Sequence, residues 1–424
     1  MPSKLTLAVR KRKTIEAAWA AIRRNARTSK SLETKEEIAA FESELSTNLT
    51  RICRQLQKNN FVFKPARGIK IPKKDKASFR PLVVAKVESR IVQRAIHDVL
   101  VSLPAIEYFV RTPYSFGGIR KKKGEEDELA AVPAAIGAVL SGIGGGAKYI
   151  IRSDISQFFT RIQKSAVTRI VMDAVKDQEF IDLFTQAIAV ELENMAQLRE
   201  AANAFPIQDI GVAQGNSLSP LLGNLILYDF DSELNKQADV KCIRYIDDFL
   251  ILAPNKSVAT NTYNKAKHIL GQLGMSVSDP KTQKCSVQDG FEFLGIELAN
   301  GLIRPTKEAQ ARVLASIEAT LTDSQTAFGK FLNTGELPMK FSLLKTLERV
   351  GGIMQGWGKH YRFCNDTKCF EHLDQKVQDL IRQYLSTYRD RRTKADANGH
   401  WRLLGIESLA QMERRPFLWP KQSK

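Results

Sequence analysis

The sequence predicts an α+β fold with an N-terminal helical extension and a helical C-terminal module. Helical periodicity runs through residues 14–28 and 33–58, and short β-prone pieces begin at Phe61. From Pro305 to about Arg391 the pattern is almost purely helical. With 424 residues the chain is long enough for two or three domains. The predicted domains are a basic helical extension at 1–60, a mixed α+β region at 61–304, a helical module at 305–391 and a tail at 392–424.

Positive charge is concentrated near the N-terminus. The chain carries 64 Lys and Arg against 46 Asp and Glu, a net charge of +18, and residues 1–80 hold 20 of the basic and 7 of the acidic residues. Such a basic arm favours a polyanionic partner, nucleic acid before membrane, over a merely solvated surface. No apolar run approaches the ~18–20 residues of a membrane span, and the N-terminus is too poor in apolar residues for a signal peptide. We therefore expect a cytoplasmic protein without a membrane partner.

The five cysteines are scattered and odd in number, which is typical of a reducing compartment and not of a disulfide framework. Four potential zinc ligands fall close together: His360, Cys364, Cys369 and His372. Their spacing matches no common zinc finger, and the segment has helical periodicity. Zinc binding is therefore the alternative to four ordinary side chains of a helical segment.

Residues 61–84 alternate short β-prone pieces with basic turns and predict a mobile hairpin. The cations near its tip are Lys73, Lys74, Lys76 and Arg80. Cations at a hairpin tip suit nucleotide phosphates, and a solvated turn is the alternative. Before this hairpin, Ser31 with Thr34 gives a start signal for the second N-terminal helix.

Helices are expected from about 86 to 103 and from 127 to 143. The glycines at 144–146 end the second of these helices. Neither G-x-x-x-x-G-K-[ST] nor G-x-G-x-x-G is present there, so the glycine cluster is a turn and not a phosphate loop. Further along, helical character is expected at 165–204 and 257–273 and a second hairpin at 291–303.

Two adjacent carboxylates, Asp247 and Asp248, lie within K-C-I-R-Y-I-D-D-F-L-I-L-A-P, a pattern that predicts a strand, a tight turn and a returning strand. Neighbouring like charges repel, so two carboxylates between apolar strands favour a divalent metal site, with Mg²⁺ the natural ion. Asp154 follows another β-branched run and offers the third carboxylate that a two-metal site needs. From the hairpin alone, an ordinary Asp-Asp turn is the alternative.

A long apolar helix is expected in G-V-A-Q-G-N-S-L-S-P-L-L-G-N-L-I-L-Y-D-F-D. Gln214 and Gly215 form a turn at its start, where small residues and free backbone N–H groups allow close approach of a ligand. Asp229 and Asp231, at its far end, are expected to be surface charges.

Eight motifs follow one another in a characteristic order: K-K-D-K-A-S-F-R-P-L, Y-S-F-G-G-I-R, S-D-I-S-Q-F-F, A-Q-G-N-S-L-S-P-L-L-G-N, R-Y-I-D-D-F, D-P-K-T, F-E-F-L-G-I and G-W-G-K-H-Y. In this order the chain resembles bacterial reverse transcriptases of the group II intron and retron type, over roughly residues 61–390. The resemblance implies a right-hand polymerase, with fingers from about 61 to 145, a palm with an antiparallel sheet around Asp154 and the acidic hairpin, and a helical thumb from about 305. It implies an RNA-directed DNA polymerase, a nucleotidyltransferase that adds dNTPs to a primer on an RNA template with two Mg²⁺ ions, for which Mn²⁺ can substitute.

The resemblance also assigns roles to residues. The implied catalytic residues are Asp154, Asp247, Asp248 and Lys281, the last as the acid that protonates pyrophosphate. The implied metal-binding set is Asp154, Ile155, Asp247 and Asp248; the nucleotide-binding set is Lys73, Arg80, Phe159 and Gln214; the primer grip is Leu294 and Gly295. Phe159 resembles an aromatic steric gate, whose ring leaves no room for a 2′-hydroxyl and so favours dNTPs. A plain core aromatic is the alternative for Phe159.

The chain departs from the family pattern in several places. It has Y-I-D-D where group II intron enzymes usually have Y-A-D-D, and F-G-G-I-R in place of Y-G-F-R. Neither an H-N-H endonuclease signature nor a clear V-T-G of the retron thumb is found. The chain is therefore similar to the unassigned groups of bacterial reverse transcriptases, several of which act in anti-phage defence with a structured non-coding RNA. The competing hypotheses are an RNA-binding, maturase-like scaffold and an untemplated or protein-primed DNA polymerase.

Overall fold

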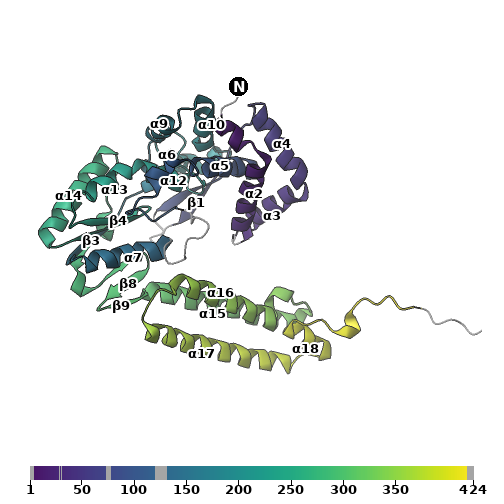
Figure 1. The fold of residues 1–424 in the computed structure, drawn as a ribbon. Helices are drawn as coiled ribbons and strands as arrows, with labels where there is room; N and C mark the ends of the chain where they lie inside the picture. Colours follow the sequence, from purple (N-terminus) through teal and green to yellow (C-terminus); the bar gives the residue numbers. More distant parts are fainter. Residues whose placement is uncertain (1–3, 28, 30, 73–77, 120–130, 418–424) are drawn as a thin grey trace, which may run out of the picture. The chain divides into compact units, whose positions relative to one another are not determined.

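The structure is a computed structural model that describes residues 4–27, 29, 31–72, 78–119 and 131–417 (Figure 1). The chain divides into two compact units, Met1–Val287 and Gln288–Lys424. The sequence places a boundary near 304, after the second hairpin, whereas the compact units divide before it. The hairpin belongs with the helices that follow because Asn365 is joined to Ile303 by hydrogen bonds in both directions, and the Arg304 guanidinium pairs with Asp366.

Four helices open the first unit: α1 (Lys4–Val9), α2 (Arg12–Arg27), α3 (Leu32–Ser43) and α4 (Leu45–Gln57). Ser31 caps α3 by accepting a hydrogen bond from the Thr34 backbone N–H, so the predicted start signal is confirmed. The single helix expected over 33–58 is wrong in one respect, because Glu44 leaves helical geometry and separates α3 from α4. Apolar faces of these helices belong to the same buried core as α5 (Val87–Leu100).

The predicted hairpin after Phe61 is formed by β1 (Arg67–Pro72) and β2 (Phe79–Val84), which pair antiparallel with Ile71 opposite Arg80. Residues 73–77, and with them Lys73, Lys74 and Lys76, lie outside the described residues.

A four-stranded antiparallel sheet forms the centre of the first unit. Its strands are β3 (Tyr149–Asp154), β4 (Lys241–Tyr245), β5 (Asp248–Ala253) and β6 (Gln283–Ser286), in the order β4-β5-β3-β6. The β5 side chains from Phe249 to Ala253 are all fully buried, because helices cover both faces of this strand. Those helices are α14 (Lys256–Gln272), which contacts β3 and β5, and α7 (Ala131–Gly144), which contacts β4 and β5.

The remaining helices of this unit surround the sheet and its loops. They are α6 (Pro104–Val110), α8 (Phe158–Arg161), α9 (Lys164–Val175), α10 (Gln178–Ile188), α11 (Met195–Leu198), α12 (Ser219–Ile226) and α13 (Tyr228–Leu234), with short 3₁₀ turns at Arg199–Ala204 and Asp279–Lys281. The long helix expected after the Gln-Gly turn is in fact two helices, since α12 ends at Ile226 and α13 begins at Tyr228.

The second unit begins with the antiparallel strands β7 (Phe291–Phe293), β8 (Ile296–Ala299) and β9 (Leu302–Pro305). Helices α15 (Lys307–Thr334), α16 (Leu343–Tyr361), α17 (Thr367–Arg392) and α18 (Ala397–Leu404) follow, and α15, α16 and α17 lie side by side (Figure 1). Thr306 and Asp366 cap α15 and α17 through their side chains. Among the described helices, none has both the length and the apolar character to cross a bilayer.

Candidate active site

Strand pairing brings the predicted carboxylates to one edge of the four-stranded sheet. β3 and β5 pair antiparallel with Asp154 directly opposite Asp248. One residue further on, the Ile155 backbone N–H donates to the Asp247 carbonyl over 2.9 Å. Residues more than ninety positions apart in the chain are thus neighbours.

The acidic pair lies at a two-residue turn between β4 and β5, because Tyr245 pairs with Asp248. The first turn residue, Ile246, has φ +61°. Hairpin turns with a positive φ at this position prefer glycine, so a β-branched residue here is strained, at a cost of about 1–3 kcal/mol. The strain must be held by surrounding contacts, and it places Asp247 at the tip of the turn.

The turn concentrates negative charge that protein cations offset only in part. Burial, followed by the charges of Asp154 and Asp248, raises the pKa of Asp247 from 3.8 to about 6. Burial also raises the pKa of Asp248, although Arg152 contacts its carboxylate at 3.4 Å. Lys281 donates from Nζ to Asp154 Oδ2 over 2.8 Å. The negative charge of these carboxylates is not fully neutralised by protein cations. Carboxylate oxygens are the ligands that Mg²⁺ prefers.

The chemistry of these donors therefore fits a hard divalent cation, but the side chains are not yet close enough together to bind one. Within the described part of the chain, no three His, Cys, Asp or Glu side chains lie close enough together to form a metal site as they stand. The carboxylates would have to draw together, and Asp154 would have to release Lys281. An isoleucine side chain carries no donor atom, so Ile155 could contribute only its backbone carbonyl.

A cavity of about 1510 Å³ opens beside this turn. Its lining includes Asp154, Ile155 and Asp247. Arg80, Phe159, Gln214 and Lys281 line the same cavity. The Asp248 side chain does not line the cavity and is 25% exposed. Lys73 lies outside the described residues. Five separate segments thus deliver seven of the predicted site residues to one space.

The turn formed by Gln214 and Gly215 is bonded to the β1–β2 hairpin. The Val83 N–H donates to the Gln214 carbonyl over 3.0 Å, which joins the turn to β2. Gly215 has φ +109°, and a Cβ there would lie 3.0 Å from the Val83 carbonyl oxygen. Only glycine suits this approach, so the Arg80 strand and Gln214 are held together.

Phe159 faces the cavity because its neighbour faces the core. Phe158 is 2% exposed and packs so closely on α12 that a Cβ on Gly223 would lie 2.7 Å from its ring. The Phe159 carbonyl accepts a hydrogen bond from Val212, which holds the backbone, and its ring is half-buried in the cavity wall.

Leu294 and Gly295 form the turn between β7 and β8 in the second unit, with φ values of +53° and +78°. The Gly295 carbonyl accepts from the Thr306 N–H, so the turn is anchored to the start of α15. The potential zinc ligands His360, Cys364, Cys369 and His372 form no metal-binding group among the described residues.

The expectation that Asp231 is a surface charge is wrong. Its side chain is 1% exposed and forms a bidentate ion pair with the buried Arg244, which no sequence prediction singled out. Helical spacing could have predicted the burial of Asp231, because it falls on the apolar face with Leu227 and Leu234. Asp229, on the other face, is exposed as predicted.

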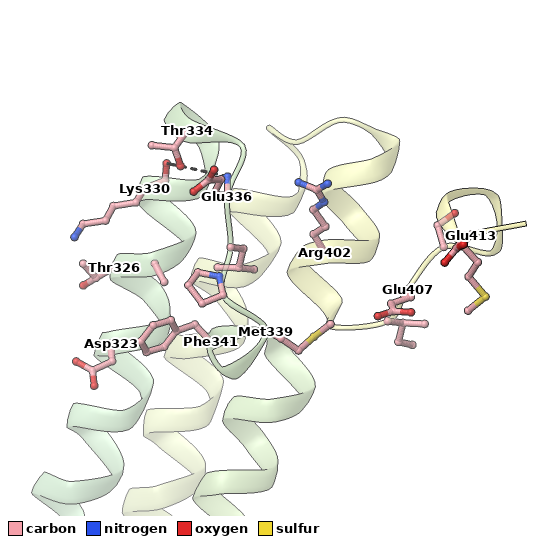
Figure 2. Close-up of a pocket in the computed structure, with 16 residues that line it drawn as sticks. Asp323, Thr326, Lys330, Thr334, Glu336, Met339, Phe341, Arg402, Glu407 and Glu413 are labelled. Carbon is pink, nitrogen blue, oxygen red and sulfur yellow. Dashed lines mark hydrogen bonds between the residues drawn. The ribbon is translucent and has the colours of Figure 1, made fainter. Parts of the chain in front are cut away.

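The second unit has a cavity of about 1180 Å³ between the end of α15, the 336–341 segment that follows it, and α18 with the residues after it (Figure 2). Arg402 on α18 donates to the Gly335 carbonyl and ties α18 to the end of α15. Acidic and basic side chains are mixed around this cavity, and none of the predicted site residues lines it.

Comparison with known proteins identifies the family. Residues 71–298, more than half of the chain, match the family model described as "Reverse transcriptase (RNA-dependent DNA polymerase)". The chain belongs to the reverse transcriptase family. This membership confirms the predicted α+β, right-hand polymerase fold class and the predicted kind of enzyme, an RNA-directed DNA polymerase.

Two curated relatives and one solved structure illustrate the likeness. The reverse transcriptase chain is 25% identical over 312 residues to Protein YkfC of Escherichia coli (strain K12), covering 65% of this chain and 77% of that protein. It is 24% identical over 186 residues to the group II intron-encoded protein LtrA of Lactococcus lactis subsp. cremoris, 43% of this chain and 27% of that protein. A truncated apo telomerase from Candida tropicalis is 16% identical with a TM-score of 0.39, covering 57% of this chain and 55% of that chain.

Proposed function

We propose that this protein synthesises DNA on an RNA template by adding dNTPs to a primer 3′ end. The observation that carries the proposal is the single cavity in which Asp154, Asp247, Arg80, Phe159 and Gln214 meet, within a domain of the reverse transcriptase family. A vestigial site of an RNA-binding scaffold would have no physical reason to combine these side chains.

Asp154, Asp247 and Asp248, with the Ile155 carbonyl, would hold two Mg²⁺ ions. Bound there, such ions supply charge neutralisation for the attacking 3′-oxygen and for the triphosphate. Arg80 offers a guanidinium to phosphate oxygens, and the Phe159 ring excludes a 2′-hydroxyl. Lys281, which is 62% exposed and donates to Asp154, would release that carboxylate and donate a proton to the leaving pyrophosphate.

Primer extension on a defined RNA tests this proposal. Asp247→Ala combined with Asp248→Ala should reduce extension by at least about 10⁴-fold, since removing the ion-binding groups removes most of the charge stabilisation. RNA binding should persist, because the basic surface is unchanged. Asp229→Ala, which removes an exposed carboxylate, is the matched control and should extend normally. Full activity of the doubly substituted protein would refute the metal assignment.

The sequence of the product separates the proposal from its rivals. A DNA complement of the supplied RNA supports reverse transcription. A homopolymer supports untemplated addition, and RNA binding without any DNA supports a maturase-like scaffold.

We propose further that the template in the cell is a structured non-coding RNA and that the product acts in anti-phage defence. The support is the resemblance to the unassigned groups of bacterial reverse transcriptases, several of which act in anti-phage defence with a structured non-coding RNA. Bacteria expressing the protein with the RNA that copurifies with it should plate phage less efficiently than bacteria expressing the variant with Asp247→Ala and Asp248→Ala. Equal plating across a broad phage panel would contradict the defence role.

A further inference from the structure

A buried arginine lies directly beneath the acidic turn. Arg244 is 0% exposed, and its guanidinium Nε and Nη2 donate to the two carboxylate oxygens of Asp231 over 2.7 and 2.5 Å. Its third nitrogen, Nη1, donates to Asn224 Oδ1 over 3.1 Å and to the Ile246 carbonyl over 3.0 Å. Every nitrogen of the guanidinium is thus engaged, and one of the bonds reaches the turn itself.

The partners of Arg244 are themselves fixed. Asn224, 1% exposed on α12, donates from Nδ2 to the Gly117 carbonyl and accepts from the Ser115 hydroxyl. The Arg244 backbone exchanges hydrogen bonds with the same loop, donating to the Tyr114 carbonyl over 2.8 Å and accepting from the Phe116 N–H over 3.0 Å. Helices α12 and α13, β4 and the 114–118 loop are therefore joined at one guanidinium.

The bond to Ile246 is made where the backbone is strained. At φ +61° a β-branched residue is held in a conformation that it rarely adopts, and without support the turn would relax to another geometry. The Arg244 Nη1 donor fixes the carbonyl oxygen of that residue, and the next residue along the chain is Asp247.

Stability alone does not account for this arrangement. A well-packed apolar pair is often as stable as a buried ion pair, because desolvation offsets the Coulombic attraction. What an apolar pair cannot supply is a charged donor aimed at the Ile246 carbonyl. The geometry therefore points to a role for Arg244 in fixing the backbone conformation of the turn.

We propose that Arg244, oriented by Asp231 and Asn224, is a positioning residue that holds the Ile246 carbonyl and thereby places the Asp247 carboxylate for catalysis. This inference rests on the proposed polymerase function and deepens it. Arg244 is buried and does not line the cavity, so it acts through the backbone of the turn.

The test compares wild type with Asp231→Leu combined with Arg244→Met, which removes both charges at similar volume. The doubly substituted protein should keep its Tm within a few degrees of wild type. Its kcat for primer extension should fall about 10- to 100-fold while KM for dNTP changes less than about threefold, because misplacement by less than 1 Å at the reacting centre is that costly. The Mg²⁺ concentration for half-maximal rate should rise. A kcat within twofold of wild type would overturn the proposal.

The matched control is Glu233→Leu combined with Lys265→Met, a surface ion pair that also begins on α13 and should leave kcat unchanged. Arg244→Lys serves if the apolar pair does not fold. It retains the buried charge, but its single nitrogen cannot reproduce the fork that bonds both Asp231 oxygens and the Ile246 carbonyl from three separate atoms. The kcat should therefore fall again, and an unchanged kcat overturns the proposal.

Rescue distinguishes positioning from general packing. Ile246→Gly relieves the positive-φ strain, so in the background of Asp231→Leu and Arg244→Met it should recover at least several-fold of the lost kcat. No recovery overturns the proposal. Wild-type protein in the same assay tests the polymerase function itself: absence of wild-type extension overturns that function and the inference with it, whereas an active wild type with no effect in the variants overturns the inference alone.

Discussion

At the residue scale, Asp247 illustrates how a carboxylate proposed to bind a cation can destabilise the folded protein when no cation is bound. Its raised pKa means that the folded protein without metal holds a carboxylate in a place that disfavours charge. A carboxyl group with a folded pKa above its unfolded value destabilises the fold at pH above the folded pKa. This penalty disappears as the pH falls through about 6 toward 4, where the group is protonated in the folded state.

Asp247→Asn should therefore stabilise the protein in EDTA at pH 8, by about 1–3 kcal/mol in the free energy of unfolding. The gain should shrink at pH 4.5, where wild-type Asp247 is neutral. Denaturant titration at both pH values measures the difference, with Asp229→Asn as the exposed control. Lower stability of Asp247→Asn than of wild type at pH 8 would show that the carboxylate is stabilising in the absence of metal.

Arg80 allows a second test at this scale, because it lines the cavity while Lys70, which pairs with the next residue of β2, Pro81, does not. Arg80→Ala should raise KM for dNTP by about 10- to 100-fold, the loss of charge-assisted hydrogen bonds to phosphate, and change kcat less. Steady-state extension at varied dNTP measures both constants. Lys70→Ala removes an exposed cation and should change neither, and an equal effect of the two substitutions would indicate a general charge effect.

At the scale of elements, the acidic turn and the 114–118 loop are packed as one piece. A Cβ on Gly117 would lie 2.6 Å from both the backbone nitrogen and Cγ1 of Ile246. The loop that reads F-G-G-I-R and the turn that reads Y-I-D-D, the two departures from the family pattern, are therefore in direct contact. The glycine provides the space in which the larger turn residue fits.

Gly117→Ala should lower the free energy of unfolding by about 2 kcal/mol or more, since the added methyl meets backbone as well as side chain. Ile246→Ala should not restore it, because the backbone nitrogen stays in place. Gly271→Ala, at a helical glycine with nothing within 4 Å, is the control and should be neutral or stabilising by up to about 1 kcal/mol. Rescue by Ile246→Ala would show that the side chain alone limits the space.

At the scale of the whole molecule, the N-terminal helices are part of the fold and not an arm that can be detached. Val9, Ile15 and Trp19 are at most 5% exposed and belong to the same core as α5 and the central sheet. The basic side chains at the end of α4 and just beyond it, by contrast, face outward around a cavity whose lining includes Arg54 and Lys58. One segment thus supplies both core and positive surface.

Deletion of residues 1–58 should consequently abolish cooperative unfolding, because α5 loses its cover. Arg54→Ala combined with Lys58→Ala should leave Tm unchanged and weaken RNA binding. The slope of log K for RNA binding against log[salt] should become less steep by about one to two units. Thermal melts and RNA titrations at several salt concentrations measure these outcomes. A folded, active deletion protein would show that the extension is independent.

Local patterns were enough to predict most elements and the hairpin that carries Asp247 and Asp248, because strand alternation and helical periodicity are properties of contiguous residues. The break at Glu44, the break between α12 and α13 and the division before Gln288 were not predicted. The last of these depends on contacts with distant residues, such as the pairing of Asn365 with Ile303.

The sequence by itself determined the family and the order of the motifs, and it predicted which carboxylates form the site, because these are questions of residue type and spacing. Only the tertiary structure showed that Asp231 is buried against Arg244 and that this pair reaches the Ile246 carbonyl. A charge on a helix is neither buried nor exposed until another segment packs on it, and here β4 supplies the partner from thirteen residues away. The partners that a side chain acquires in space, and not its neighbours in the chain, decide what it does.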